Sequence, residues 1–258
     1  MINKDVGGTQ YKGALNMRIL IIRHGDPDYS IDSLTEKGWR EAELLSERIS
    51  KLDVAAFYCS PLGRAKDTAS LTLKKMGREA QILDWLKEFY YCRVRVPYVK
   101  DETVLCWDLL PSFFTKIDDL YDNDKFQYVD FMAEGDYPAL YKNITDNLDA
   151  LLEKHGYHRC GRYYEAVKPN RDTIVFFCHF GLECQMLGHL LSISPVVLGQ
   201  NFCAAPTSVT TLYTEEREKG IASFRMASFG DISHLYAAGE EPAFSARFCE
   251  TYDSDERH

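Results

Sequence analysis

The sequence predicts an α/β fold of three layers, in which helices cover both faces of a mostly parallel, mixed sheet. Three observations support this prediction. Short, almost continuous apolar runs alternate with segments whose apolar residues recur at helical spacing. Such runs are typical of strands that are buried on both faces, as in a helix-covered sheet. The composition, 45% hydrophobic and 27% charged, is that of an ordinary globular chain with a sizeable core.

The first half of the chain begins with a βαβα alternation. Met17–Ile22 predicts a buried strand, and Val54–Cys59 predicts a second one. Between them, residues 35–52 carry apolar side chains at helical spacing, with Thr35 placed to cap the helix start. Ser60-Pro61 is expected to open the next helix, because proline is tolerated in a first helical turn.

The alternation is interrupted after Phe89. Residues 90–171 are expected to form an inserted helical cap, because aromatic and basic residues crowd its start. Helices are predicted in it around residues 104–121 and 137–155. The oligomeric state stays open, since the aromatic residues of this insertion suit either a substrate wall or a contact between copies of the chain.

The basic pattern then resumes and closes the domain. Asp172–Cys178 predicts another buried strand, followed by a helix over residues 182–191. Residues 207–214 and 221–229 predict two closing strands, and residues 239–258 are polar and expected to be irregular. We therefore expect one domain over residues 17–258, preceded by a flexible extension of residues 1–16.

Charge and composition narrow the classes of partner. The formal charge of −9 and the lack of Lys/Arg runs disfavour nucleic acid, although a local cluster of arginines can still bind a small anion. No apolar stretch has the length of a signal peptide core or of a membrane span. The eight cysteines are scattered and predicted to be reduced. These features favour a cytoplasmic location away from membranes.

Polar residues follow three of the predicted strands. Arg23-His24-Gly25 comes after the first strand, the segment 60–64 with Arg64 after the second, and His179 after the strand that ends at Cys178. The carboxyl ends of parallel strands meet at one edge of a sheet, where helix N-termini point their N–H groups at anions. Arginines bind phosphate oxygens in bidentate fashion, and imidazole is nucleophilic near neutral pH. The sequence therefore predicts a phosphoryl-transfer site.

The chain resembles the histidine phosphatase superfamily, the phosphoglycerate-mutase-like group. The motifs that carry the resemblance are RHG at residues 23–25, LTEKG at 34–38, SPLGRAKDTA at 60–69, and the histidine that ends the strand before residue 180. Asp231 and the late His234-Leu235 are also similar to the family pattern. The match runs in order over roughly residues 17–235, and the insertion is covered only by its position.

The resemblance implies a role for each residue of the cluster. His24 attacks phosphorus and becomes phosphohistidine, while Arg23, Arg64 and His179 bind the equatorial oxygens. Glu88 matches the position of the family's proton donor, first as general acid and then as base for the attacking water. Asp84 is the second candidate for this role, and Glu183 ranks below it.

Three further residues are candidate substrate contacts. Ser30, six residues after the nucleophile, matches a position where the family often has a small polar phosphate contact. The backbone N–H of Phe180 follows the second histidine and is expected to face the phosphoryl group. Arg93 is a candidate for a distal anionic part of the substrate, against the plainer expectation of a solvated charge.

Two departures from the family pattern affect the expected substrate. The family commonly has Glu or Gln after RHG and Gly after its second histidine, where this chain has Asp26 and Phe180. The family's mutases carry an ERxYG segment and an Arg-Arg pair, whereas here Phe89-Tyr90-Tyr91-Cys92 follows the candidate acid. The resemblance therefore implies the phosphatase branch, with a small phosphorylated substrate and no cofactor.

Three alternatives remain beside a metal-independent phosphatase. One is a mutase, which returns the phosphoryl group to the same molecule. Another is a binding module without catalysis, which would be expected to lack the nucleophile or the acid. The third is a metal site built from His24, Asp26, Glu88 and His179, which the two nearby arginines disfavour because they would repel a cation. A nucleophilic Cys178 is disfavoured by its place inside a buried strand.

Overall fold

The computed structural model describes residues 16–244 and 251–254. The strands of the main sheet are β1 (Arg18–Arg23), β4 (Ala56–Cys59), β5 (Gln81–Ile82), β8 (Tyr157–Cys160), β9 (Tyr163–Ala166), β10 (Thr173–Cys178), β11 (Val209–Glu218) and β12 (Ile221–Asp231). Two small hairpins pair β2 (Pro27–Asp28) with β3 (Ser33–Leu34), and β6 (Arg93–Val94) with β7 (Val104–Leu105). The predicted extension lies outside the described residues, except for Asn16.

Helices and short helical turns make up the rest of the regular structure. The α-helices are α1 (Glu36–Ile49), α2 (Gly63–Met76), α3 (Pro111–Phe114), α4 (Asp130–Glu134), α5 (Tyr137–Lys154), α6 (Phe180–Leu191), α7 (Pro195–Asn201) and α8 (Ser233–Ala237). The 3-10 turns are η1 (Asp84–Leu86), η2 (Phe89–Tyr91), η3 (Asp118–Tyr121) and η4 (Phe126–Tyr128).

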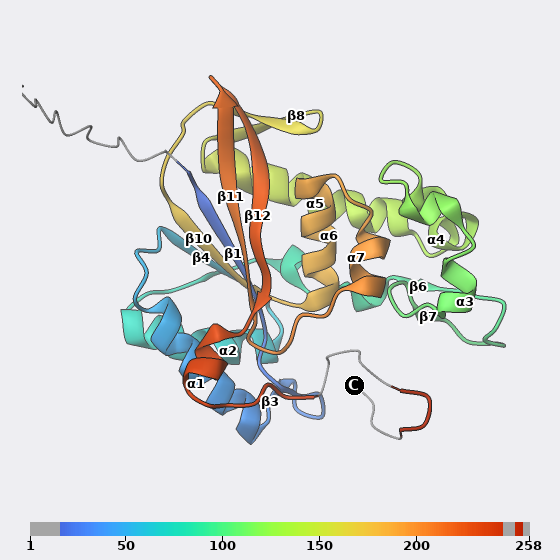
Figure 1. The fold of residues 1–258 in the computed structure, drawn as a ribbon, viewed down its shortest axis with the longest axis horizontal. Coiled ribbons are helices and arrows are strands. Elements are labelled where there is room, and N and C mark those ends of the chain that lie inside the picture. Colours follow the sequence, from blue (N-terminus) through green and yellow to red (C-terminus); the bar gives the residue numbers. More distant parts are fainter. Residues whose placement is uncertain (1–15, 245–250, 255–258) are drawn as a thin grey trace, which may run out of the picture.

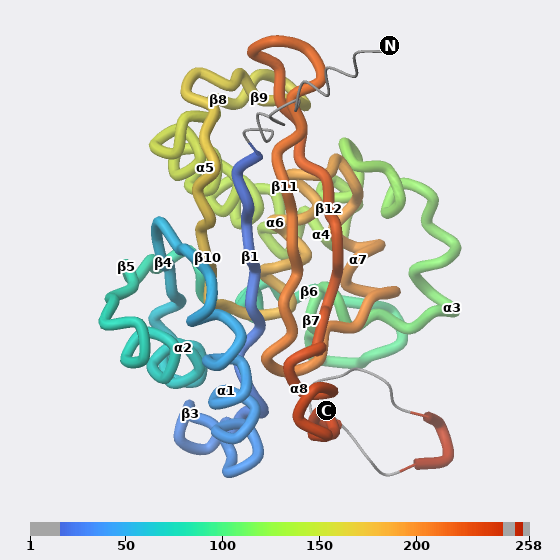
Figure 2. Tube along the Cα trace, turned by 60° about the vertical axis from the view of Figure 1, so that its left-hand side comes forward, coloured from blue at the N-terminus to red at the C-terminus, as the bar shows by residue number. Residues whose placement is uncertain are grey.

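The main sheet is mixed. Its strand order is β5-β4-β10-β1-β11-β12-β9-β8, and the first six of these strands can be followed from left to right in Figure 2. The strands from β5 to β1 pair in parallel, and those from β11 onward pair antiparallel. The α/β fold class is confirmed, but the parallel part is smaller than expected because two hairpins extend the sheet.

Helices cover both faces of the sheet (Figure 1). Alternate residues of the central strands face opposite sides, so that Leu20 and Phe177 pack in one buried cluster with α1 and α2. Ile19 and Phe176 face the other cluster, which includes residues of α5 and α6. Because both faces are covered, the central strands are apolar throughout, which is the pattern that made them recognisable in the sequence.

The central elements agree with the sequence-based expectations. Each of the five predicted strands is present, with bounds that shift by a few residues. Thr35 caps α1, and its side chain accepts a hydrogen bond from the Gly38 N–H over 3.0 Å. The helix after Ser60-Pro61 begins only at Gly63, which leaves the Ser60 side chain outside the helix.

The predicted helix over residues 104–121 is wrong. This segment contains β7, α3 and η3 instead of one continuous helix. Pro111 supplies the physical reason, because proline lacks an N–H and disfavours helical geometry in the residue before it. Leu110 has an extended backbone, with φ −64° and ψ 134°, and the short α3 starts at the proline.

The insertion over residues 90–171 has two structurally different parts. Residues from β6 to α4 lie beside α6 and α7 on the right of Figure 1. In contrast, β8 and β9 form a hairpin that joins the main sheet through β12. The sequence did not indicate these two strands, because their exposed and buried residues are interrupted by the turn at Gly161.

The described residues also bear on the expectations about membranes and cysteines. Within residues 16–244 and 251–254, no helix combines the length and apolar character needed to cross a bilayer. In the same part of the chain, no disulfide joins the cysteines.

The centre of the sheet offers a test of the fold. Phe176 is fully buried, and its ring lies 5.2 Å from that of Tyr58, centroid to centroid. We expect Phe176→Ala to lower the free energy of unfolding by about 3–5 kcal/mol, because it leaves a cavity between the sheet and α5. Tyr128→Ala, at a side chain that is 64% exposed, is the control and should change it by less than about 0.5 kcal/mol. Denaturant unfolding monitored by circular dichroism measures both.

Candidate active site

Three loops meet at the carboxyl ends of adjacent parallel strands. β1 leads to His24, β4 leads to Ser60 and Arg64, and β10 leads to His179. Backbone hydrogen bonds lock the loops together, since the His24 N–H donates to the Cys178 carbonyl over 3.0 Å and the Ser60 N–H donates to the Phe177 carbonyl over 2.9 Å. The predicted convergence of these segments is therefore present.

His24 is held in one tautomer by its own loop. Its Nδ1 lies 2.8 Å from the Gly25 carbonyl oxygen, which can only accept a hydrogen bond. The neutral ring must therefore carry its proton on Nδ1. Nε2 keeps a lone pair, which is the form that a nucleophile needs.

His179 lies close to His24 and is the N-cap residue of α6. The two ring centroids are 5.1 Å apart. The Nε2 of His179 lies 2.8 Å from the Ser60 hydroxyl oxygen, and its buried Nδ1 has no hydrogen-bond partner among the described residues. In the tautomer in which the Ser60 hydroxyl donates to Nε2, Nδ1 carries the ring proton and can donate to a phosphoryl oxygen.

Ser60 is a site residue that sequence reasoning did not single out. It is fully buried, and its hydroxyl also accepts a hydrogen bond from the Leu62 N–H over 3.2 Å. The hydroxyl therefore fixes the orientation of His179. The serine is the first residue of the SPLGRAKDTA motif, in which the sequence indicated a role for Arg64 and not for Ser60.

Arg23 lies at the inner end of the cluster. Its guanidinium donates to the Ala204 carbonyl oxygen and lies 5.5 Å from the centre of the Phe180 ring. This is within the range of a cation–π contact. The side chain of Phe180, where the family commonly has glycine, thus packs against the guanidinium of Arg23.

Arg64 lies in the first turn of α2 and is 8% exposed. Its Nη1 donates to the Asp32 carboxylate over 2.6 Å, and its guanidinium lies 5.4 Å from the Tyr29 ring centre. Its Nε is buried and has no hydrogen-bond partner in the part of the chain that the structure describes. Tyr29 is an exposed aromatic at this point, and no sequence motif marked it.

The electrostatics keep both histidines neutral. Burial lowers the pKa of His24 well below 6.5, and the positive charges of Arg23 and Arg64 lower it further. Burial and the same neighbours also lower the pKa of His179 well below 6.5. The cluster therefore presents positive charge and N–H groups to an anion, while the nucleophile stays unprotonated in mild acid.

Glu88 is brought to the N-terminus of α6. Its carboxylate accepts hydrogen bonds from the N–H groups of Phe89 over 2.7 Å, Leu182 over 3.0 Å and Gly181 over 3.2 Å. Burial raises its pKa above 4.5, while these backbone bonds and the charge of Arg23 limit the rise. The sequence-based candidate for the acid thus lies at the start of the helix that the second histidine caps, in surroundings that raise its pKa.

The two other candidate acids lie in different surroundings. Asp84 is exposed and pairs with Lys87 over 2.5 Å. Glu183 is 1% exposed, and burial raises its pKa to about 7, although a hydrogen bond from Thr210 and the charge of Arg23 lower it. None of the described residues forms a hydrogen bond with its Oε1.

Two predicted substrate contacts make their hydrogen bonds elsewhere. Ser30 is exposed, and both its N–H and its hydroxyl donate to Asp28 in a tight turn. Arg93 is exposed and donates to Thr103 within the β6–β7 hairpin. The structure does not show either side chain bonded to the histidine cluster.

The LTEKG motif supports the loop that follows His24. The Asp26 side chain accepts a hydrogen bond from the Thr35 hydroxyl over 2.7 Å. The backbone N–H of Asp26 donates to the Glu41 carboxylate over 3.1 Å. Gly38 lies so close that an added Cβ would be 2.2 Å from the Asp26 carbonyl oxygen. The glycine is therefore required for α1 to pack against this loop.

A chain of hydrogen bonds supports His24 from the opposite side. The Thr207 N–H donates to the His24 carbonyl over 3.1 Å, and Thr207 has a φ of +58°, which is unusual for a β-branched residue. Its hydroxyl donates to Pro206, so that the contact of 3.1 Å with His234 Nε2 must be donated by the histidine. His234 in turn faces Arg48, which pairs with Asp231 over 2.7 Å.

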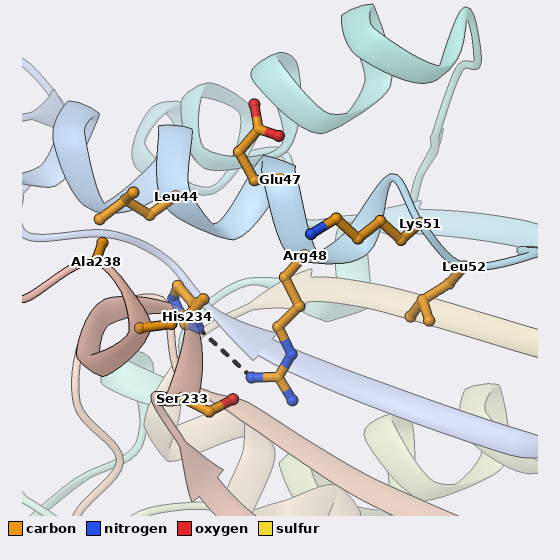
Figure 3. A pocket seen from close by; sticks show the side chains of 9 residues that line it. Leu44, Glu47, Arg48, Lys51, Leu52, Ser233, His234 and Ala238 are labelled. Carbon is orange, nitrogen blue, oxygen red and sulfur yellow. Dashed lines mark hydrogen bonds between the residues drawn. The ribbon is translucent and has the colours of Figure 1, made fainter.

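His234 and Arg48 line a pocket between α1 and α8 (Figure 3). Its volume is about 570 Å³, and its lining is mostly apolar, with Leu44 and Leu52 on the α1 side. Burial lowers the pKa of His234 to about 4, so the ring stays neutral and keeps its Nε2 proton for Thr207 near neutral pH. The family-like Asp231 and His234 therefore form a support behind His24.

The alternative metal site lacks a suitable geometry. Among the described residues, no three His, Cys, Asp or Glu side chains are grouped so that they could hold a metal ion. Burial raises the pKa of the Cys178 thiol well above 9, which makes it a poor nucleophile.

Comparisons with known proteins point to one family. A sequence profile of the histidine phosphatase superfamily (branch 1) matches residues 19–102, which include both the RHG and the SPLGRA segments. A 2,3-bisphosphoglycerate-dependent phosphoglycerate mutase of Thermoplasma acidophilum is 33% identical over 70 residues, which are 23% of this chain. The chain thus spans only 35% of the length of that relative.

Solved structures share the fold over most of the chain. A phosphoglycerate mutase from Bacillus anthracis aligns with a TM-score of 0.59 and 18% identity, covering 88% of this chain and 98% of the other. A phosphoserine phosphatase mutant from Entamoeba histolytica, solved with phosphoserine, aligns with a TM-score of 0.53 and 18% identity, covering 85% and 99%. At these identities the likeness shows the fold.

The hydrogen bonds from His234 through Thr207 to His24 lead to a prediction about activity. We expect His234→Leu to lower kcat about tenfold, because Thr207, which bonds the His24 carbonyl, loses the hydrogen bond from His234. Displacing a reacting group by 1 Å can lower the rate about a hundredfold. His234→Gln should retain more of kcat, since its amide N–H can reach the same hydroxyl. Steady-state kinetics with p-nitrophenyl phosphate compares the two. Equal losses in both variants would contradict this account.

The buried Glu183 generates a second prediction, on stability. Because folding raises its pKa from 4.5 to about 7, its stabilising contribution is complete below pH 4.5 and is lost as the pH rises through about 7. As the pH rises from 4.5 to about 7, the free energy of unfolding of Glu183→Gln should therefore increase relative to that of the wild type, by up to about 3 kcal/mol. Urea unfolding at pH 4.5, 6 and 8 measures the difference. The exposed Glu218→Gln is the control, and the same trend in both variants would refute the assignment.

Proposed function

We propose that the chain, whose residues 19–102 match the histidine phosphatase superfamily, is a phosphatase that hydrolyses small phosphomonoesters through a phosphohistidine on His24. The observation that carries this proposal is the fixed tautomer of His24, whose Nδ1 faces the Gly25 carbonyl, inside a buried cluster with Arg23, Arg64 and His179. A nucleophilic nitrogen, positive charge and an unpartnered ring nitrogen at one place suit an incoming phosphoryl group.

In the first step, Nε2 of His24 attacks phosphorus and forms a P–N bond. The bond from phosphorus to the ester oxygen breaks, and the carboxylic acid of Glu88 gives its proton to the leaving alkoxide. Arg23, Arg64 and His179 stabilise the charge on the equatorial oxygens. The products of this step are an alcohol and phosphohistidine.

In the second step, water hydrolyses the phosphoenzyme. The Glu88 carboxylate accepts a proton from the water, whose oxygen attacks phosphorus while the P–N bond breaks. Inorganic phosphate leaves, His24 returns to its neutral form and Glu88 is again protonated. The bonds from the N–H groups of Gly181 and Leu182 stabilise the carboxylate between the two steps.

A phosphatase is favoured over a mutase by the sequence around the acid. The segment after Glu88 forms η2 with Phe89 and two tyrosines, and it lacks the ERxYG pattern of the family's mutases. The solved relatives include both a phosphatase and a mutase, so the fold alone does not separate the two activities. We also propose that turnover requires no metal, because arginines supply the charge that a metal would otherwise provide.

The proposal extends to the setting of the enzyme. A small phosphorylated substrate, rather than nucleic acid, suits a chain with a formal charge of −9 and a few buried arginines. A cytoplasmic location is supported by cysteines that form no disulfide within the described residues.

Kinetics of the nucleophile and the acid test the mechanism. With p-nitrophenyl phosphate and a chelator present, we expect His24→Ala to lose at least about 10⁴-fold in kcat, because no P–N bond can form. Glu88→Gln should lose about 10²–10⁴-fold in kcat/KM, which reports the first step, with an alkyl phosphate, whose leaving group needs a proton, and much less with p-nitrophenyl phosphate. Full activity of His24→Ala, or an equal loss of kcat/KM on both substrates in Glu88→Gln, would contradict the mechanism.

The pH dependence follows from the two pKa shifts. The low pKa of His24 keeps the nucleophile neutral, so that kcat/KM should not fall until the pH is well below 6.5. The raised pKa of Glu88 moves the alkaline limb for alkyl phosphates above 4.5, and this limb should vanish in Glu88→Gln. A profile from pH 4 to 9 checks both limbs. An acid limb near 6.5 that remains after correction for the ionisation of the substrate phosphate would show that His24 is not desolvated as described.

A further inference from the structure

We propose that Asp32 is a positioning residue of the phosphoryl site: its carboxylate holds the Arg64 guanidinium so that Nε is directed to a phosphoryl oxygen. This inference rests on the proposed function. Asp32 lies in the loop between β2 and β3, and no motif marked it in the sequence. The cluster itself does not require a carboxylate, since the substrate supplies the negative charge.

The contacts of the Asp32 carboxylate are specific. Its Oδ1 accepts a hydrogen bond from Arg64 Nη1 over 2.6 Å, and its Oδ2 accepts one from the Gly63 N–H over 2.6 Å. The first bond fixes the outer part of the guanidinium, and the second ties the loop to the first turn of α2. Charge-assisted bonds of this length are strong and directional.

The Nε of Arg64 remains available to a ligand. Arg64 is 8% exposed, and among the described residues its buried Nε has no hydrogen-bond partner. Burying an N–H group without a partner is unfavourable, and a substrate oxygen that accepts this bond would remove the penalty. Nδ1 of His179 would act as a second donor in the tautomer in which Ser60 donates to Nε2.

The backbone around Asp32 is adapted to this contact. Asp32 has a φ of +48°, a left-handed conformation that is uncommon for a residue with a side chain. The approach to α2 requires Gly63, because an added Cβ would lie 1.9 Å from the Asp32 carbonyl oxygen. The left-handed backbone of Asp32 and the missing side chain of Gly63 together allow the Asp32 carboxylate to reach Arg64.

The charge of Asp32 is maintained in the fold. Burial alone would raise its pKa, but the hydrogen bonds from Gly63 and Arg64 outweigh burial and lower it below 3.8. The carboxylate therefore stays ionised wherever the enzyme would act. The alternative to positioning is competition: the Asp32 carboxylate would occupy the phosphoryl site as an internal anion, and the substrate would have to displace it. Asp32 accepts from Nη1 of Arg64 and not from the buried Nε, which favours positioning, since an anion that mimics the phosphoryl group would be expected to accept from Nε as well.

The two roles make opposite predictions about anion affinity. Positioning predicts that Asp32→Ala raises the inhibition constant of inorganic phosphate and of orthovanadate by about ten- to a hundredfold, and lowers kcat/KM with p-nitrophenyl phosphate to a similar extent. Asp32→Asn, which keeps one acceptor oxygen, should lie between Asp32→Ala and the wild type. Tighter phosphate binding, or constants that match the wild type, would overturn the proposal.

A matched control and a double variant keep the test independent of folding. Asp28→Asn changes a carboxylate in the same loop that bonds Ser30 and not Arg64, and it should leave the constants unchanged. In an Arg64→Lys background, Asp32→Ala should cause a much smaller further loss of phosphate affinity, measured by calorimetry without turnover. A full further loss would refute positioning through Arg64. A wild type that neither binds phosphate nor hydrolyses the ester would instead overturn the proposed function, and this inference with it.

Discussion

The burial of positive charge and of unpaired N–H groups at one edge of the sheet is the constraint on which the site depends. Arg23, His24, Arg64 and His179 are each 8% exposed or less, and the Nε of Arg64 has no hydrogen-bond partner within residues 16–244 and 251–254. In such surroundings an anion gains more from each interaction than it would in water. The same burial keeps the imidazoles neutral. The arginines can therefore neutralise the charge of the phosphoryl group while the histidine remains a nucleophile.

The fold supplies this edge through its topology. The parallel strands β4, β10 and β1 end side by side, and each continues into a loop that carries a site residue. Helices α2 and α6 begin directly after two of these loops, so their N-termini also point at the cluster. A carboxylate meets each of the two termini, Asp32 at α2 and Glu88 at α6. Of these two carboxylates, we assign positioning to the first and proton transfer to the second.

The core of the site could be predicted because its residues lie in short motifs next to strands that are apolar on both faces. The supports could not be predicted in this way. The bond from His234 to Thr207 spans 27 residues, and the left-handed backbone of Thr207 has no signature in a β-branched residue. Ser30 was selected by its offset from His24, but the loop turns at Asp28, so the serine points to its own loop.

The errors in the fold have equally local causes. A proline at position 111 overrode the apolar spacing that suggested one helix, and the hairpin of β8 and β9 is short and polar enough to look like part of the insertion. The least predictable aromatic at the site is Tyr29, whose position against Arg64 is set by tertiary packing rather than by any local pattern.

The central claim, a covalent phosphoenzyme on His24, is tested most directly by trapping it. The protein is mixed with a phosphate ester, quenched in alkali within milliseconds, digested and analysed by mass spectrometry. The account predicts a phosphoryl group on the peptide that contains His24, stable in alkali and lost in acid, more abundant in Glu88→Gln with p-nitrophenyl phosphate because the attack of water is slowed. Hydrolysis of the ester without any phosphoryl group on His24, or with the phosphoryl group on another residue, would contradict the account.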